Sequence, residues 1–226
     1  MLGKSIGTNS LLLGLFALIT AGVLASTKLL TNDRIAAAER AAAQKALLQI
    51  VPLERHDNDL LVDTFDIPEK FWHQLGLKKG GDIYLARDQE NFVAAIIPTV
   101  AADGYSGKIG MMIGINLDGS LAGVRVLTHT ETPGLGDKID LKKSDWILTF
   151  NGKSLTNPRL EGWKVKKDGG EFDAFTGATI TPRAVVKAVK KTLLVFDTIK
   201  PQLLIQGATQ KPTPKPITLN TPEVTP

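Results

Sequence analysis

The sequence predicts an α+β protein in which an antiparallel β-sheet, with helices at its ends, follows one membrane-spanning helix. Three observations support this class. An apolar run occupies residues 10–30, which is about the length of helix that crosses a bilayer. Short strand-like runs separated by turn residues fill residues 82–128. The apolar spacing of an amphipathic helix then covers residues 182–200.

The composition excludes several classes of protein. The chain has 226 residues, 43% of them hydrophobic and 22% charged, which is enough for one domain with a real core. Its net charge of +4 is spread without a Lys/Arg run, which argues against nucleic-acid binding. With no cysteine and no metal-ligand spacing among its three histidines, the chain predicts no disulfide, iron–sulfur cluster or other metal site.

Residues 1–9 are predicted to be a short cytoplasmic N-terminus and residues 10–30 a transmembrane anchor. The apolar run contains no acidic residue and no charge before Lys28. Lys4 precedes it, so the positive-inside rule places the N-terminus in the cytoplasm and the rest of the chain outside it. A signal peptide cleaved after Val23-Leu24-Ala25 is the alternative, although the run is long for one.

Residues 31–52 are predicted to form a helical stalk between the anchor and the folded domain. Asn32-Asp33 can cap a helix over residues 34–50, whose Ala-rich sequence has high helix propensity. Pro52 ends the pattern. A surface helix packed on the domain would show the same pattern.

Residues 53–200 are predicted to be the folded domain. Its strands are expected in the apolar runs 83–86, 92–97, 108–116 and 121–128. Asp118-Gly119 is a tight hairpin signal between the last two, so the spacing favours an antiparallel meander. Residues 144–150 could be a short helix or a strand. Another hairpin is predicted in residues 163–175, around Asp168-Gly169-Gly170.

Residues 173–182 read Asp-Ala-Phe-Thr-Gly-Ala-Thr-Ile-Thr-Pro and lead from that hairpin into the last helix. Thr181 is a natural N-cap, and Pro182 suits the first helical position, where no N–H is needed. Thr179 would then lie near free backbone N–H groups at the positive end of a helix, which suits a phosphate. The Gly-Ala pair before Thr179 adds little bulk beside it.

Residues 201–226 are predicted to be a disordered Pro/Thr-rich tail. The tail contains a second Gly-Ala-Thr at residues 207–209, without the preceding Asp and without a following helix signal. The triplet alone therefore carries little information.

A polar loop at residues 129–138, His-Thr-Glu-Thr-Pro-Gly-Leu-Gly-Asp-Lys, follows the last predicted strand. Its Pro and Gly residues preclude a regular element. Polar groups in a loop at a strand end are the usual material of a binding site, although many Pro/Gly loops are only turns.

The Asp-x-x-Thr-Gly-Ala-Thr string at residues 173–179 resembles the flavinylation motif of the FMN-binding domains in bacterial redox-driven ion pumps. In that family a flavin transferase joins FMN by a phosphoester bond to the last Thr, which here is Thr179. The resemblance implies covalent FMN, held by the motif residues Asp173, Thr176, Gly177, Ala178, Thr179 and Thr181. Asp173 could assist attachment as a base or as a metal ligand of the transferase, or be a strand-end charge without a role.

The loop at residues 129–136 resembles the second signature of the same family, which lies beside the flavin. It implies that further contacts to FMN come from His129, Glu131, Thr132, Gly134 and Leu135. Leu135 and the Pro-Gly backbone before it could offer a flat apolar surface to the isoalloxazine ring. His129 and Glu131 could contact polar atoms of the ring or the ribityl chain. Lys166 or Lys167 could balance flavin charge, or be solvated.

Residues 1–200 as a whole resemble the G subunits of the Rnf (Rsx) electron-transport complexes, and less closely the C subunit of the sodium-pumping NADH:quinone reductase. The string Asp103-Gly104-Tyr105-Ser106-Gly107 adds to the two motifs. The resemblance implies a single-pass inner-membrane protein with its FMN domain on the periplasmic side. It would pass electrons between partner subunits from ferredoxin towards NAD, while the complex moves Na⁺ or H⁺. Such a chain is a redox subunit, not a complete enzyme.

Two other functions stay open at this point. One is a stand-alone flavinylated periplasmic electron-transfer protein. The other is a non-redox, membrane-anchored binding module in which the Thr-rich loop only caps a helix.

Overall fold

The computed structural model describes residues 2–89 and 91–206. It divides into two units, one of residues 1–41 and one that begins at Ala42. Helix α1 (Leu2–Ile50) makes up the described part of the first unit and continues into the second. The expected start of a separate helix after Asn32-Asp33 is therefore wrong, because both flanking segments favour the helix and it runs through this pair without a break.

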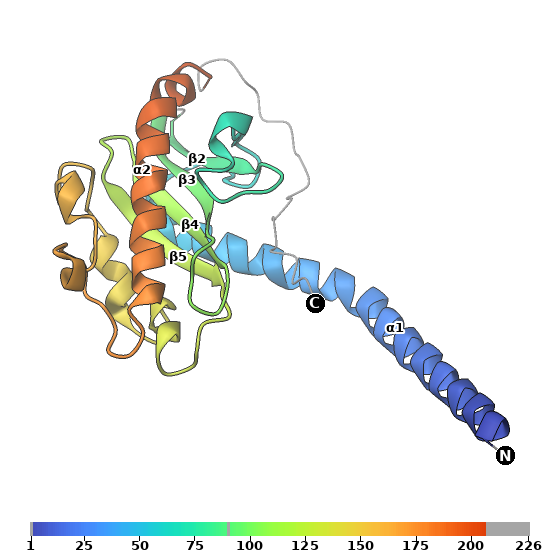
Figure 1. Cartoon of the computed structure of the whole chain (residues 1–226). Coiled ribbons are helices and arrows are strands. Elements are labelled where there is room, and N and C mark those ends of the chain that lie inside the picture. Colours follow the sequence, from blue (N-terminus) through green and yellow to red (C-terminus); the bar gives the residue numbers. More distant parts are fainter. Residues whose placement is uncertain (1, 90, 207–226) are drawn as a thin grey trace. The chain divides into compact units, whose positions relative to one another are not determined.

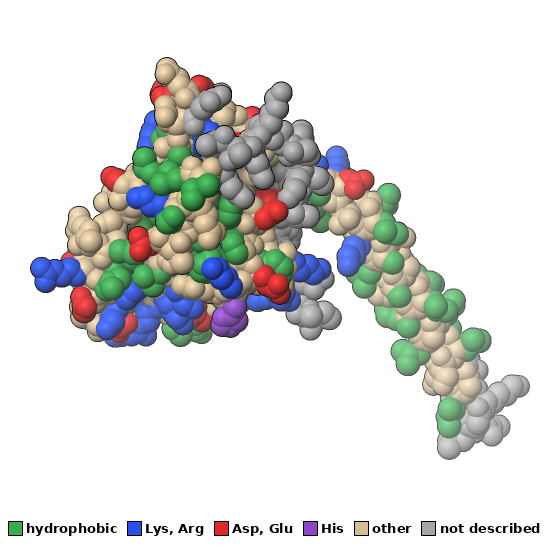
Figure 2. Space-filling model, turned by 90° about the horizontal axis from the view of Figure 1, so that it is seen from above, with side chains coloured by type: hydrophobic (Ala, Val, Ile, Leu, Met, Phe, Trp, Pro, Cys, Tyr) green, Lys and Arg blue, Asp and Glu red, His purple; other side chains and the backbone are tan. Residues whose placement is uncertain are grey.

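The α1 segment Asn9–Ile50 is long and apolar enough to cross a membrane. The large apolar side chains between residues 11 and 30 are exposed, with Leu11, Leu13 and Leu18 all above 70%. Figure 2 shows hydrophobic side chains along this helix, with charged side chains only on its part farther from the N-terminus. The expected N-terminal helix that is long and apolar enough to span a membrane is therefore confirmed.

The second unit is built on a five-stranded antiparallel sheet with strand order β1-β2-β3-β4-β5 (Figure 1). The strands are β1 (Thr64–Asp66), β2 (Asp82–Asp88), β3 (Asn91–Ala101), β4 (Ile109–Asn116) and β5 (Leu121–Thr128). The predicted α+β class and its four expected strands are confirmed. The sequence missed β1, because three residues are too few for a period-2 pattern.

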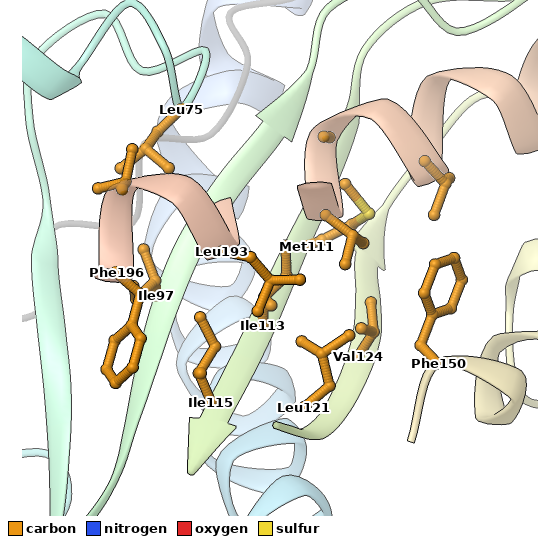
Figure 3. Close-up of a cluster of buried hydrophobic side chains, with 14 of the residues drawn as sticks. Leu75, Ile97, Met111, Ile113, Ile115, Leu121, Val124, Phe150, Leu193 and Phe196 are labelled. Atoms are coloured by element: carbon orange, nitrogen blue, oxygen red, sulfur yellow. The ribbon is translucent and has the colours of Figure 1, made fainter. Parts of the chain in front are cut away.

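Helix α2 (Ile180–Gln206) covers one face of this sheet (Figure 1). Its Leu193 and Phe196 pack over Ile97 and Ile113 (Figure 3). These two isoleucines are direct partners in the β3–β4 register, so side chains from adjacent strands form one apolar surface for the helix.

The last turns of α1, residues 43–50, pack on the opposite face together with Ile96 and Met112. A Cβ added at Gly114 would lie 2.1 Å from Cγ2 of Ile50, so the close approach of this helix end depends on the glycine. With both faces covered, β3 and β4 are nearly continuous apolar runs.

Helix α2 does not end at Lys200, as expected, but continues through Pro201 to Gln206. Leu203, beyond the proline, is fully buried in the same core, and this packing keeps the chain helical. The rest of the expected tail, including the second Gly-Ala-Thr, lies outside the described residues.

The hairpin expected in residues 163–175 is wrong. The two arms share only an isolated bridge between Val165 and Phe172, and it is parallel. Both side chains are buried in one cluster with Phe150, instead of alternating between two faces. A Cβ at Gly170 would lie 2.0 Å from a backbone oxygen of the first arm, so the chain folds back more tightly than a hairpin allows.

Short 3₁₀ helices complete the domain. They are η1 (Leu53–Arg55), η2 (Glu69–Phe71), η3 (Gly136–Ile139), η4 (Asp145–Phe150), η5 (Leu160–Gly162) and η6 (Lys166–Asp168). Residues 144–150, for which the sequence allowed either a short helix or a strand, contain the 3₁₀ helix η4.

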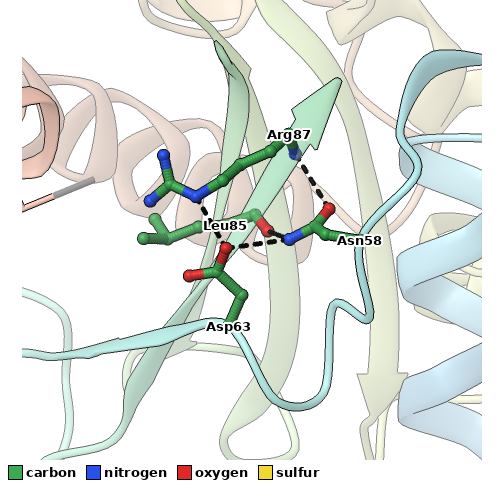
Figure 4. Close-up of polar contacts among 4 residues, drawn as sticks. All are labelled: Asn58, Asp63, Leu85 and Arg87. Carbon is green, nitrogen blue, oxygen red and sulfur yellow. Dashed lines mark hydrogen bonds and ion pairs between the residues drawn. The ribbon is translucent and has the colours of Figure 1, made fainter. Parts of the chain in front are cut away.

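Polar contacts tie the segment after α1 to β2 (Figure 4). Nε of Arg87 lies 2.6 Å from Oδ2 of Asp63, and both side chains are mostly buried. The Asn58 amide donates to the carbonyl of Leu85 and to Asp63, and its oxygen accepts the Arg87 N–H at 2.9 Å. The charges are therefore both paired and hydrogen-bonded, as buried charges must be.

Candidate functional site

The motif at residues 173–179 ends in a tight turn that leads directly into α2. Phe175 and Ala178 form an isolated antiparallel bridge, with a 3.1 Å hydrogen bond from the Ala178 N–H to the Phe175 carbonyl. Gly177 has a φ of 81°, which favours glycine. Thr179 is half-buried and immediately precedes α2. It therefore lies where the first N–H groups of a 27-residue helix have no intrahelical partner.

The prediction that Thr181 is the N-cap is wrong. Helix α2 begins at Ile180, so Thr179 occupies the cap position and Pro182 follows within the first turn. Thr181 is fully buried, and its hydroxyl donates to Oε2 of Glu131. Local sequence could not reveal this acceptor, which is 50 residues away along the chain.

Glu131 connects three segments of the site. Its Oε2 accepts from Thr181 at the start of α2, and its Oε1 accepts the N–H of Ser106 at 2.9 Å. The neighbouring Thr130 hydroxyl donates to the Ser106 carbonyl at 2.9 Å. Glu131 is only 4% exposed, and both of its oxygens have protein donors. Glu131 thus links the segment around Ser106 to the start of α2, and its contact with FMN stays a prediction.

The 129–138 loop and the motif turn lie against each other. The Thr132 carbonyl accepts the N–H groups of the three residues after the Pro-Gly pair, at 3.0 to 3.3 Å, and Gly134 has a φ of 76°. Cδ2 of Leu135 lies 3.6 Å from the Cβ position of Gly177, and Leu135 is 42% exposed. Two motifs separated by forty residues in the sequence thus form one surface with an exposed apolar side chain beside the turn.

The next two residues of this loop are buried. A Cβ at Gly136 would lie 2.9 Å from Oγ1 of Thr181 and 3.0 Å from Oε2 of Glu131, so only glycine fits without a shift. Asp137 follows in η3 and is 8% exposed. Within the described residues, its Oδ1 atom is buried and has no hydrogen-bond partner.

Two of the remaining predicted residues are less enclosed. His129 is half-buried, and its Nδ1 accepts the Glu131 N–H at 3.2 Å. Thr176 is exposed in the motif turn. Both lie in the two loops that the structure brings together.

Asp173 is anchored through its backbone, while its side chain is exposed. Its carbonyl accepts the indole N–H of Trp146 at 2.9 Å. Its carboxylate forms a 2.7 Å ion pair with Lys166, which the sequence suggested as a counter-charge for the flavin. Because both side chains are more than half exposed, this pair contributes little to stability and either partner can exchange it for another.

A second ion pair holds η6 against the first turn of α2. Arg183 donates to both carboxylate oxygens of Asp168, at 2.6 and 2.5 Å. The hydrogen bonds from Arg183 lower the pKa of Asp168, and the same bonds raise the pKa of Arg183. The arginine nearest to the motif is thus already engaged.

Sequence reasoning did not assign Ser106, Trp146 or Asp137 to the site. Ser106 belongs to a string that entered only as part of the family resemblance, and Asp137 belongs to a signature loop but not to its selected residues. Trp146 carries no local signal, since its contacts with Asp173 and with the ring of Phe175, at 5.0 Å, are purely tertiary. Among residues 2–89 and 91–206, no group of three or more His, Cys, Asp or Glu side chains could hold a metal ion.

Comparison with known proteins matches residues 104–194 to the FMN-binding domain family and residues 1–50 to the RnfG N-terminal region. Three similar proteins are each named as the G subunit of an ion-translocating oxidoreductase complex. The one from Vibrio atlanticus (strain LGP32) is 45% identical over 203 residues, which cover 90% of this chain and 96% of the relative. That from Shewanella amazonensis is 50% identical over 196 residues (84% and 88%), and that from Pseudomonas aeruginosa is 48% identical over 201 residues (89% and 93%).

Proposed function

The chain belongs to the family of G subunits of ion-translocating oxidoreductase complexes, and from this premise we propose that it is an electron-transfer subunit with FMN joined by a phosphoester to Thr179. One observation carries the attachment site. Thr179 is the half-buried residue at the start of α2, between the Gly177 turn and the Glu131–Thr181 contact. Helix N–H groups there can receive phosphate oxygens.

The residues around Thr179 fit a flavin nucleotide. Gly177 and Ala178 add little side-chain bulk before Thr179, and Leu135 supplies an exposed apolar side chain beside the Gly177 turn. The buried Asp137 oxygen, which lacks a partner among the described residues, supplies an acceptor for a donor group of the ligand. Thr176, Ala178, Thr132 and Gly134 complete the two loops, as the family resemblance implies. When bound, FMN supplies the one- and two-electron chemistry, and the protein supplies position and electrostatics.

Attachment needs an external enzyme, because a threonine hydroxyl is a weak nucleophile. The Thr179 oxygen forms a bond to the FMN phosphorus of a flavin dinucleotide, the phosphoanhydride bond breaks, and the nucleoside monophosphate leaves. The hydroxyl proton passes to a base. The exposed carboxylate of Asp173, six residues before Thr179, is available to the flavin transferase for this purpose or as a ligand for its metal.

The proposed setting is a bacterial inner membrane, crossed once by α1. Lys4 precedes the apolar segment, which supports a cytoplasmic N-terminus and a periplasmic FMN domain. The other membrane subunits of the complex are the proposed electron partners, on a route between ferredoxin and NAD that is coupled to Na⁺ or H⁺ movement.

The first test is the intact mass of the chain co-expressed with a flavin transferase, beside Thr179→Ala and the matched control Thr176→Ala. An FMN-sized mass and yellow fluorescence that survives denaturation are expected in the wild type and in Thr176→Ala, but not in Thr179→Ala. No mass gain in the wild type, while a known substrate of the transferase is modified, would refute the covalent flavin and leave the binding module. A gain in Thr179→Ala would move the attachment site elsewhere.

Membership of a complex is tested separately. The flavinylated chain, purified from its own membranes in mild detergent, should bring other subunits of the oxidoreductase with it. If it is flavinylated but purifies alone under conditions that keep such complexes intact, it is a stand-alone electron-transfer protein.

A further inference from the structure

The buried carboxylate of Asp137 offers the site an acceptor whose donor is not found among the described residues. The residue is 8% exposed, and its buried Oδ1 has no hydrogen-bond partner among residues 2–89 and 91–206. Buried polar atoms in native proteins nearly always have a partner, because an unpaired one costs free energy. A carboxylate offers only acceptor sites, so the group that completes it must be a donor.

The position of Asp137 relative to Thr179 follows from its neighbours. Leu135 lies against Gly177, two residues before Thr179, and Gly136 lies against Thr181, two residues after it. The loop therefore runs beside the motif turn, and Asp137 is the next residue along it. It belongs to η3, which packs on α2.

Of the carboxylates in the two motifs, only Asp137 is both buried and incompletely paired. Glu131 is also buried, but each of its oxygens already accepts from a protein donor. Asp173 is exposed and paired with Lys166. A ligand with a hydrogen-bond donor close to Thr179 would therefore find its acceptor at Asp137.

We propose that Asp137 accepts a hydrogen bond from a ribityl hydroxyl of the FMN carried by Thr179. This assignment rests on the proposed function. The phosphate oxygens and ring carbonyls of FMN are acceptors and cannot pair with a carboxylate, so the available donors are the ring N3–H and the three ribityl hydroxyls. The ribityl chain links the phosphate on Thr179 to the ring, so its hydroxyls are the donors closest to the attachment point, and the loop that carries Asp137 runs beside that point. Asp137 thereby orients the flavin relative to its attachment point and is a binding residue.

The test compares the melting temperature of the full chain in detergent before and after flavinylation, and the readout is the gain that the flavin confers. Asp137→Leu replaces the carboxylate by an apolar group of similar shape, and Asp137→Asn keeps one uncharged acceptor. Asp140→Asn is the matched control, because Asp140 lies in the same segment but its Oδ1 accepts the Lys142 N–H at 2.9 Å. Intact mass confirms equal flavin content in all samples.

Wild type and Asp140→Asn should show the same gain. Asp137→Leu should melt no lower than wild type without flavin, and should lose about 4–8 °C of the gain with it, because a charge-assisted hydrogen bond is missing. Asp137→Asn should fall between them, since neutral hydrogen bonds are roughly half as strong.

The opposite pattern would overturn the assignment. If Asp137→Leu lowers the melting temperature of the unmodified chain and both variants keep the wild-type gain, the carboxylate serves the fold alone. Failure of the proposed function is visible separately, because the wild type would then gain no mass at Thr179, and the assignment would fall with it.

Discussion

Replacing Thr181 with valine removes one hydroxyl from the centre of the site and keeps the side-chain shape. Thr181 is fully buried at the start of α2, and its hydroxyl donates to Oε2 of Glu131. Threonine and valine are both β-branched and have similar helix propensities, so the change isolates the lost donor.

The expected cost follows from the burial of the acceptor. Glu131 is 4% exposed, so its Oε2 cannot replace the lost donor with bulk water. An unsatisfied buried acceptor costs about 1–3 kcal/mol, and a charged one lies towards the upper end. For a domain of this size, a loss of about 2 kcal/mol lowers the melting temperature by roughly 4–8 °C.

Chemical denaturation followed by tryptophan fluorescence measures this loss. Thr198→Val is the matched control, because Thr198 lies on the same helix, is exposed, and donates to the Leu194 carbonyl at 2.9 Å. It should change the free energy of unfolding by less than about 0.5 kcal/mol. Thr181→Val combined with Glu131→Gln should cost less than the sum of the single changes, since the two share one bond. Equal losses at Thr181 and Thr198, or strict additivity with Glu131→Gln, would refute the reasoning.

Three further outcomes are expected. Gly136→Ala should destabilise the domain by about 1–3 kcal/mol, because its Cβ would lie 2.9 to 3.0 Å from buried polar atoms. The control Gly81→Ala, with no neighbour nearer than 3.5 Å, should cost less than half as much in the same denaturation assay. Burial favours a raised pKa at Asp103, but the hydrogen bond and charge of Lys187 outweigh it and lower the pKa. The stability that this pair contributes is therefore fully present above the ordinary Asp pKa of about 3.9, and it is lost as the pH falls through the pKa of Asp103 in the folded state. An NMR titration should show the pKa of Asp103 rising in Lys187→Gln; an unchanged pKa would contradict the assignment. Gly114→Ala should loosen the last turn of α1 from the sheet, measured as faster amide hydrogen exchange there, and unchanged exchange would show that the helix end does not depend on this glycine.

The sheet and both long helices were readable from the sequence because each depends on a local period. The apolar runs that became β2 to β5 needed only period-2 or continuous hydrophobicity and turn residues such as Asp118-Gly119. Both α1 and α2 were longer than expected for one reason. The capping pair Asn32-Asp33 in α1 is a weak start signal and Pro201 in α2 a weak stop signal. The helix-forming residues around the first and the burial of Leu203 beyond the second outweigh them.

The failed hairpin shows where local pattern stops being informative. Residues 163–175 combine a Gly-Gly turn with β-forming residues, and this is the usual hairpin signal. In the fold, Val165 and Phe172 point into one aromatic cluster with Phe150. A hairpin would alternate its side chains between two faces, so burying this cluster requires an irregular loop. Burial of large side chains outweighed the turn preference of the Gly-Gly pair.

The sequence predicted which two segments form the site but not the role of each residue in them. The two acidic residues of the 129–138 loop show why. Glu131 and Asp137 are six residues apart, and the pattern gives no reason to treat them differently. The fold gives them different surroundings. Glu131 accepts hydrogen bonds from Ser106 and Thr181, whereas Asp137 is also buried but has one oxygen without a partner among the described residues. The first therefore stabilises the arrangement that presents Thr179, and the second is left with capacity for a ligand. Removing the Thr181 hydroxyl should therefore lower the stability of the modified and unmodified chains alike, whereas removing the Asp137 carboxylate should lower only that of the modified chain.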